Sequence, residues 1–89
     1  MRTIITVMGV DKAGIIAKVS GCLYQYGVNI LDINQTIMQD IFTMIMMADL
    51  KNAKATEAEI KNALETIGNE IGVDIRMQNE DIFNSMHRI

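Results

Sequence analysis

Residues 56–78, which read TEAEIKNALETIGNEIGVDIRMQ, combine a helix and a strand across one glycine. Thr56 and Glu59 have the Thr-x-x-Glu spacing of a capping box, in which each side chain accepts a backbone N–H at the start of a helix. The apolar residues that follow recur at helical spacing until Gly72 interrupts them. Beyond the glycine, apolar and polar residues alternate, as in a strand with one wet face. This segment predicts a helix that ends at Gly72 and a strand over residues 73–78.

The sequence before residue 56 predicts, in chain order, a strand, a helix and two further strands. The first stretch is short, β-branched and closed by a glycine, which favours a strand. The next carries apolar side chains at helical spacing ahead of Gly27, which predicts an amphipathic helix. A tight connection at Gln39 and Asp40 joins the last two stretches as a hairpin. The predicted strands are residues 3–8, 28–39 and 41–50, and the predicted helix is residues 13–26.

The resulting order βαββαβ matches the ferredoxin-like split βαβ motif, a two-layer α+β sandwich. The first and third strands are apolar on both faces and the other two on one face only, which predicts the antiparallel sheet order 2-3-1-4, with the more apolar strands in the centre. Two helices cover only one face of such a sheet. The residues expected to face the helices are Ile5, Val7, Phe42, Met44 and Met46, and those expected to form an uncovered stripe are Ile4, Met8, Ile45 and Met47.

The C-terminal residues 79–89 follow the last predicted strand and have their own apolar pattern. Ile82, Phe83, Met86 and Ile89 have the spacing of an amphipathic helix. We expect a short helical tail that covers the open stripe, in the same chain or in a partner chain.

Composition limits the classes of protein that this chain can represent. Its 89 residues are enough for one domain, and so small a core favours a homodimer or higher homo-oligomer. The net charge of −3 argues against direct binding to nucleic acid. One cysteine, Cys22, allows no internal disulfide, and no apolar run is long enough to span a membrane, so the expected location is the cytoplasm.

Several functions of ferredoxin-like folds need residues that this chain lacks. The loop after the first strand has no Cys-x-x-Cys pair for a soft metal and no arginine for a phosphoryl group. Phe42 is the only aromatic residue on the first or third strand, too few rings to stack RNA bases. His87 is the only histidine, and no companion ligand lies near it in the sequence. We therefore expect no enzyme, no metal and no cofactor.

Two short runs at either end of the first predicted helix carry a family resemblance. They are Asp11-Lys12-Ala13-Gly14-Ile15-Ile16 and Tyr26-Gly27-Val28-Asn29-Ile30. An acidic residue, a glycine three positions later and a Gly-Val-Asn-Ile entry to a strand together resemble the ACT domain. The resemblance covers about residues 2–78, and it implies a single domain over residues 1–89. The tail resembles a narrower group of free-standing ACT proteins related to the repressor of the glycine cleavage system.

The ACT resemblance implies a binding site for a small amino-acid-like effector between two domains. Gly14 would let the effector approach the backbone, Asp11 would accept its ammonium group, and Asn29 would reach it from the neighbouring domain. Three simpler roles remain open: Asp11 as the helix N-cap, Gly14 as a close-packing residue and Asn29 as a turn residue. The implied effector-binding residues are Asp11, Lys12, Ala13, Gly14, Asn29 and Ile30.

Two functions remain in competition. The first is a homodimeric regulatory domain that binds an effector and signals to a partner protein. The second is a protein-interaction module in which the fold serves dimerisation and the effector site is lost. Ala13 stands where many ACT domains have a proline, which leaves the predicted binding loop less constrained.

Overall fold

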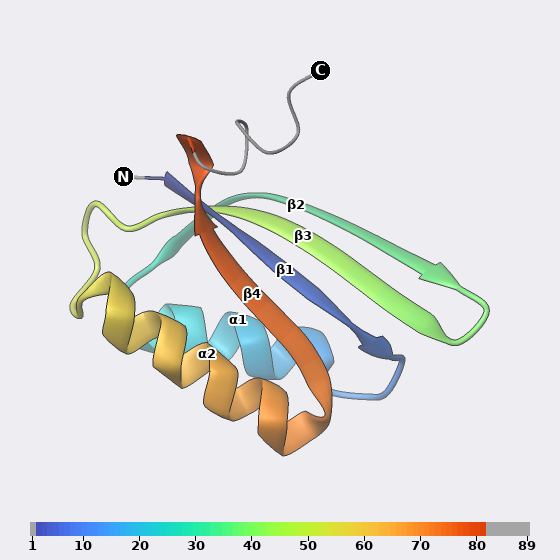
Figure 1. Ribbon diagram of the computed structural model, residues 1–89. Coiled ribbons are helices and arrows are strands. Elements are labelled where there is room, and N and C mark those ends of the chain that lie inside the picture. Colours follow the sequence, from blue (N-terminus) through green and yellow to red (C-terminus); the bar gives the residue numbers. More distant parts are fainter. Residues whose placement is uncertain (1, 82–89) are drawn as a thin grey trace.

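The computed structural model describes residues 2–81, in which two helices pack on one face of a four-stranded antiparallel sheet (Figure 1). The strand order is β2-β3-β1-β4, so the predicted βαββαβ fold and its strand order are confirmed. The element bounds lie within two residues of those expected. They are β1 Arg2–Val10, α1 Ile15–Gln25, β2 Asn29–Met38, β3 Ile41–Asp49, α2 Glu57–Ile71 and β4 Val73–Asn79.

The start of α2 has the predicted capping box. The Thr56 hydroxyl accepts the backbone N–H of Glu59 at 3.1 Å, and the Glu59 carboxylate accepts the N–H of Thr56 at 3.4 Å. Gly72 ends the helix in the left-handed conformation, with φ 74°, and its N–H bonds to the carbonyl of Gly68. Local sequence therefore determines both ends of α2.

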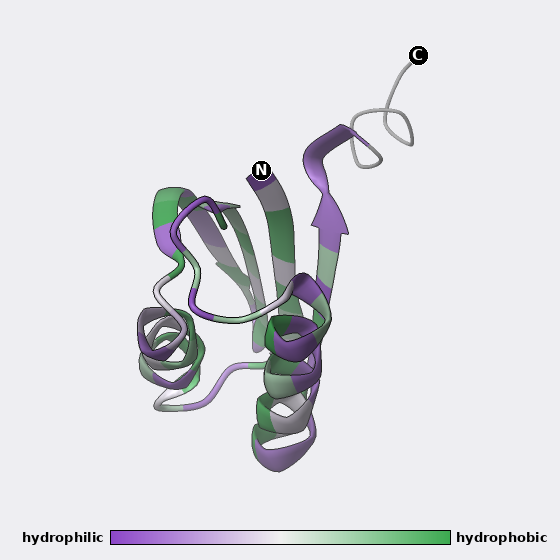
Figure 2. Cartoon of the chain, turned by 90° about the vertical axis from the view of Figure 1, so that its left-hand side faces the viewer, coloured by the Kyte–Doolittle hydropathy of each residue, from purple (hydrophilic) through white to green (hydrophobic). Residues whose placement is uncertain are grey.

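The core lies between the sheet and the two helices. Figure 2 shows hydrophobic residues on the helix surfaces that face the sheet and hydrophilic residues on the outer surfaces. Thr3 is a buried polar residue on this side, and its hydroxyl donates to the carbonyl of Gln78 at 2.7 Å. All five residues predicted to face the helices are buried: Ile5, Val7, Phe42, Met44 and Met46.

The edge strand β2 has an irregularity that alternation alone does not predict. Ile30 pairs with Ala48 and Asp32 pairs with Met47, so Leu31 is an extra residue on β2. Such a bulge shifts the side-chain phase of the strand. Because of the bulge, Ile30 and Ile33 lie on the same face of the sheet, beside their partners Ala48 and Met46, although they are three positions apart.

The face of the sheet away from the helices is apolar, as expected, but not uniformly open. Met8 is 54% exposed and Ile45 42% exposed, which confirms two members of the predicted stripe. Met47 is only half-buried. Ile4 is wrong as an open position, because only 5% of it is exposed. Ile4 belongs to the central strand β1, where it pairs with Met47 on β3 and with Gln78 on β4.

The predicted tail falls largely outside the described residues. Asn79 belongs to β4, and residues 80–81 are helical. Residues 82–89, which include His87 and the apolar positions expected to cover the stripe, are not described. The tail remains a prediction.

Replacing Thr56 by Ala should lower the free energy of unfolding by about 1 kcal/mol, because the first turn of α2 loses its cap. Thr66→Ala is the matched control, since the Thr66 hydroxyl only donates to the carbonyl of Asn62 in the same helix. Urea unfolding followed by circular dichroism measures both variants. Equal stability of the two would contradict a stabilising role for the cap.

The Cys22 thiol should react slowly with alkylating reagents in the folded protein. Burial on the inner face of α1 raises the pKa of this thiol, and only the thiolate is an effective nucleophile. Mass spectrometry after iodoacetamide treatment at pH 8 should show rapid modification in urea and slow modification without it. Similar rates in both conditions would mean that this part of α1 opens freely.

Candidate functional site

The loop between β1 and α1 leaves the start of the helix without a side-chain cap. Gly14 is the N-cap residue, and no side chain of the described residues binds the backbone N–H groups there. Asp11 lies three positions earlier and is exposed. The interpretation of Asp11 as the N-cap is therefore wrong, and the partial positive charge of the helix start faces solvent.

Gly14 has a backbone conformation that explains the glycine. Its φ is 91°, in the left-handed region that other residues adopt at a cost. A Cβ built on Gly14 would meet no atom within 4 Å. Close packing therefore does not account for this glycine. Open space lies directly beside the uncapped helix start, where a small ligand could approach the backbone.

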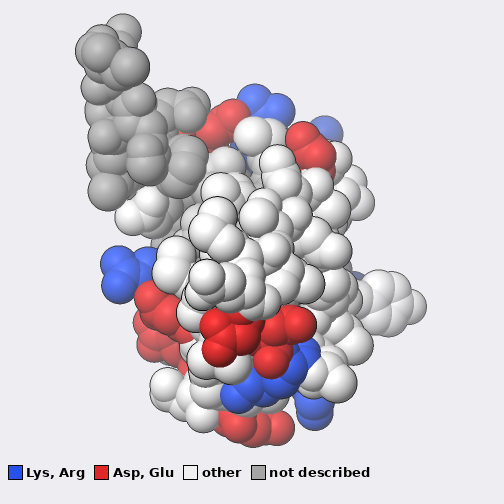
Figure 3. Space-filling model, turned by 90° about the vertical axis from the view of Figure 1, so that its right-hand side faces the viewer, with Lys and Arg blue, Asp and Glu red and all other residues white. Residues whose placement is uncertain are grey.

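A backbone hydrogen bond ties this loop to the far end of the β2–β3 hairpin. The N–H of Asp11 donates to the carbonyl of Asp40 at 2.7 Å. The loop therefore lies beside the point where β2 ends and β3 begins. Figure 3 views this end of the molecule, where uncharged residues fill the middle of the face and acidic and basic side chains lie around it, most densely in the lower half.

Lys12 extends toward the end of α2. Its Nζ lies 3.1 Å from the position that a Cβ on Gly72 would occupy. An ammonium group at a helix C-terminus is favoured by the helix dipole. Lys12 therefore has a structural role available at α2, beside the ligand role that the family resemblance implies.

Asn29 and Ile30 lie at the opposite end of the sheet from this loop. Asn29 pairs with Asp49, whereas Val10 at the start of the loop pairs with Ile41 at the other end of β3. Eight steps of about 3.3 Å along a strand separate the two ends by about 26 Å. One chain therefore does not bring the six predicted site residues together.

A shallow hollow of about 390 Å³ surrounds Asn29. Tyr24, which is 85% exposed, and Lys54 line it beside the backbone of Gly27. The N–H of Lys54 donates to the carbonyl of Tyr26 at 2.8 Å, which holds the loop after β3 against the end of α1. Sequence reasoning missed Tyr24 and Lys54. A large aromatic outside the apolar stripe of its helix was the available signal for Tyr24.

No three side chains among His, Cys, Asp and Glu in residues 2–81 are close enough together to hold a metal ion. Within the same residues, no helix is long and apolar enough to cross a membrane.

Comparison with known proteins identifies the fold and its relatives. A family model described as "ACT domain" matches residues 2–78. A UPF0237 protein from Methanococcus maripaludis is 54% identical over 88 residues, which cover 99% of this chain and 98% of that protein.

Two solved structures show the same architecture. An ACT domain protein from Streptococcus pneumoniae superposes with a TM-score of 0.80 at 40% identity, covering 93% of each chain. A putative glycine cleavage system transcriptional repressor superposes with a TM-score of 0.77 at 23% identity, covering 86% of this chain and 44% of that one. The second likeness is one of fold.

Gly14→Ala should lower the free energy of unfolding by about 1 to 2 kcal/mol, although the new methyl group has room, because φ at this position is left-handed. The control is Gly21→Ala in the exposed middle of α1, where a Cβ also meets nothing. That change should raise stability by about 0.5 to 1 kcal/mol. The melting temperatures of the two variants should move in opposite directions. A Gly14→Ala variant more stable than the unaltered protein would contradict the cost of the left-handed conformation at this position.

Proposed function

This chain belongs to the ACT domain family, and we propose that it is a regulatory domain that binds a small amino-acid-like effector between two copies of itself. ACT domains generally act as regulatory, small-molecule-binding domains. The observation that carries the proposal is the uncapped start of α1 with open space at Gly14. The family points to regulation rather than catalysis, so we propose a cytoplasmic protein with no reaction of its own.

The edge strand β2 supports a symmetric dimer. All of its residues except Ile30 are exposed, including the apolar Ile33 and Ile37. In an antiparallel pairing of two β2 strands, Ile33 can lie opposite Ile37 of the second copy on the helix side, which buries both. The pairing would continue one four-stranded sheet into the next.

The same pairing would bring the predicted site residues, which lie far apart in one chain, close together across two copies. Antiparallel strands place the start of one β2 beside the end of the other. With Ile33 opposite Ile37, Asn29 falls beside the hairpin turn of the second copy. The Asp11–Asp40 hydrogen bond holds the loop between β1 and α1 next to that turn. Each site would therefore take Asp11, Gly14 and their neighbours from one copy and Asn29 from the other.

The chemistry of these groups fits a zwitterion. The N–H groups at the start of α1 and the dipole of the helix favour a carboxylate. The exposed carboxylate of Asp11 would accept an ammonium group, and the Asn29 amide offers both donors and an acceptor. Lys54, beside Asn29, adds a cation from the second copy. An amino acid satisfies all of these groups at once.

The second candidate, an interaction module, is favoured by the open face of the sheet. Met8, Val10, Ile41 and Ile45 are exposed there and lie on the neighbouring strands β1 and β3. A partner protein that covers this face would need no effector. The location of the contact between copies, on β2 or on this open face, separates the two functions.

When the common amino acids are tested one at a time at millimolar concentration, only one or two of them should raise the melting temperature of the protein. A ligand that binds the native state alone stabilises it by about 2.7 kcal/mol at a hundredfold excess over Kd. Gly14→Ala should abolish the rise while the dimer persists, because its methyl group occupies the proposed ligand space. Gly21→Ala should keep the rise. A flat panel for the unaltered protein would refute effector binding.

Charge substitution should locate the dimer contact. Ile37 on β2 and Met8 on the open face are 53% and 54% exposed, so a glutamate costs each monomer little and to the same degree. Ile37→Glu should shift the protein toward monomer in sedimentation velocity at micromolar concentration, and Met8→Glu should leave the dimer intact. The reverse result would place the interface on the open face and favour the interaction module.

A further inference from the structure

The outer edge of β4 borders a groove that the effector site does not use. The groove has a volume of about 420 Å³ and runs between α2 and β4. β4 is an edge strand, paired with β1 on one side and with no other strand of residues 2–81 on the other. It lies at the opposite edge of the sheet from β2, so a ligand here would not compete with the proposed dimer.

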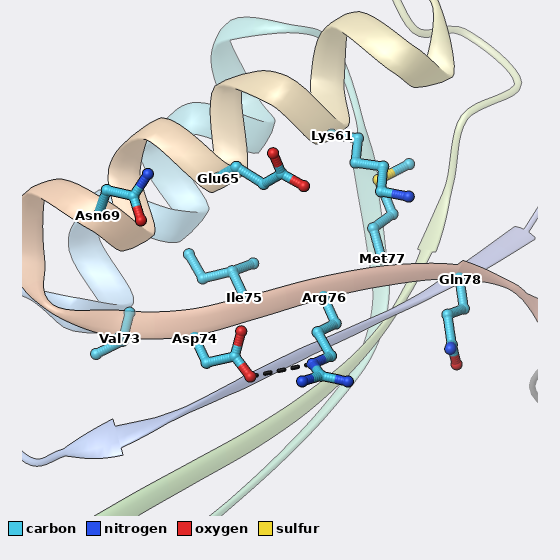
Figure 4. Close-up of a pocket in the computed structure, with 9 residues that line it drawn as sticks. All are labelled: Lys61, Glu65, Asn69, Val73, Asp74, Ile75, Arg76, Met77 and Gln78. Atoms are coloured by element: carbon cyan, nitrogen blue, oxygen red, sulfur yellow. Dashed lines mark hydrogen bonds and ion pairs between the residues drawn. The ribbon is translucent and has the colours of Figure 1, made fainter.

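Figure 4 shows how the two walls of the groove are arranged. Lys61, Glu65 and Asn69 project from α2 at intervals of four residues, so they form one polar stripe along the helix. Asn69 lies above Val73, Glu65 above Ile75 and Lys61 above Met77. The stripe therefore runs parallel to the strand edge along most of its length.

The edge of β4 offers main-chain hydrogen bonds in a fixed pattern. In an antiparallel pair, alternate residues direct both N–H and C=O away from the partner strand. Over the seven residues of β4, three or four residues present such pairs outward. A groove between an exposed strand edge and a helix is the geometry in which an extended peptide adds as a further strand.

We propose that this groove binds an extended segment of a partner protein, which adds to β4 as a fifth, antiparallel strand. Side chains of the segment that lie opposite Met77 and Ile75 would point toward α2, because those residues are on the helix side of β4. The side chain opposite Met77 would meet the Lys61 ammonium, and the side chain opposite Ile75 would meet the Glu65 carboxylate. The segment therefore carries an acidic residue followed two positions later by a basic residue.

A second copy of this chain fits the same edge poorly. If two β4 strands paired about a twofold axis at Arg76, the two Arg76 side chains would lie opposite each other. An axis at Ile75 would bring together the two Glu65 carboxylates, which lie above that residue. Like charges placed directly opposite are destabilising, and charged edge strands resist self-pairing.

Two capped six-residue peptides of identical composition test the proposed charge pattern. Acetyl-TEVKVT-amide places Glu opposite Met77 and Lys opposite Ile75, and acetyl-TKVEVT-amide reverses them. In amide NMR titrations of the full chain, the first should shift the signals of β4 and the groove side of α2. It should bind at least about fivefold more tightly than the second.

Exchanging the two charges of the groove should exchange the preference. Lys61→Glu with Glu65→Lys keeps the net charge and the helix spacing, and should make acetyl-TKVEVT-amide the tighter peptide. The control exchanges the charges of a pair outside the groove, Lys18→Glu on α1 with Glu70→Lys on α2, whose charged atoms are 3.9 Å apart. That variant should keep the original preference. An unchanged preference in the groove variant would overturn the charge pattern.

N-methylation of the peptide tests whether it adds as a strand. Methyl groups on one alternate set of peptide nitrogens should abolish binding, and methyl groups on the other set should leave most of it, because only one set faces β4. Equal effects of the two sets would overturn strand addition. NMR shifts confined to β2, or no shift at millimolar peptide, would also overturn the proposal. So would a concentration-dependent dimer of the chain alone that Arg76→Asp disrupts.

Discussion

Two helices cannot cover a four-stranded sheet completely, and this limit determines where the molecule offers binding surfaces. Apart from Ile4, the buried side chains of β1, β3 and β4 lie over α1 and α2, whereas nearly all of β2 is exposed. Apolar residues also remain exposed on the face away from the helices. The core thus stabilises the fold, and within residues 2–81 each edge strand pairs with one neighbour only, so its outer edge can serve as a template for pairing with another chain.

The position of the loop between β1 and α1 follows from the same arrangement. The loop leaves a central strand at the end of β1 and enters α1, whose first residue, Ile15, is already buried in the core. Gly14 makes this change of direction in a conformation that suits glycine, and the helix is left without a side-chain cap. A cap would have stabilised α1 by about 1 kcal/mol. The missing interaction is available to a ligand instead.

The two edges of the sheet have different chemistry, which suits them to different partners. β2 exposes apolar side chains and can pair with itself without placing charges together. β4 carries the Asp74–Arg76 pair and is flanked by the charged stripe of α2, so it favours a foreign segment of matching charge. If the domain dimerises through β2, the edge of β4 stays accessible, because the two central strands β3 and β1 separate the two edges.

Sequence patterns alone were enough to predict the order of the elements, the capping box at Thr56, the end of α2 at Gly72 and the residues that face the helices. These features depend on local periodicity and on backbone groups that are satisfied within a few residues. The sequence also identified Gly14 and Asn29 as candidates through a family pattern. It did not determine the bulge at Leu31, the burial of Ile4 or the 26 Å (about eight strand steps) between the two halves of the site. These features could not be predicted from local patterns, because each depends on which distant segments of the chain lie side by side in the fold.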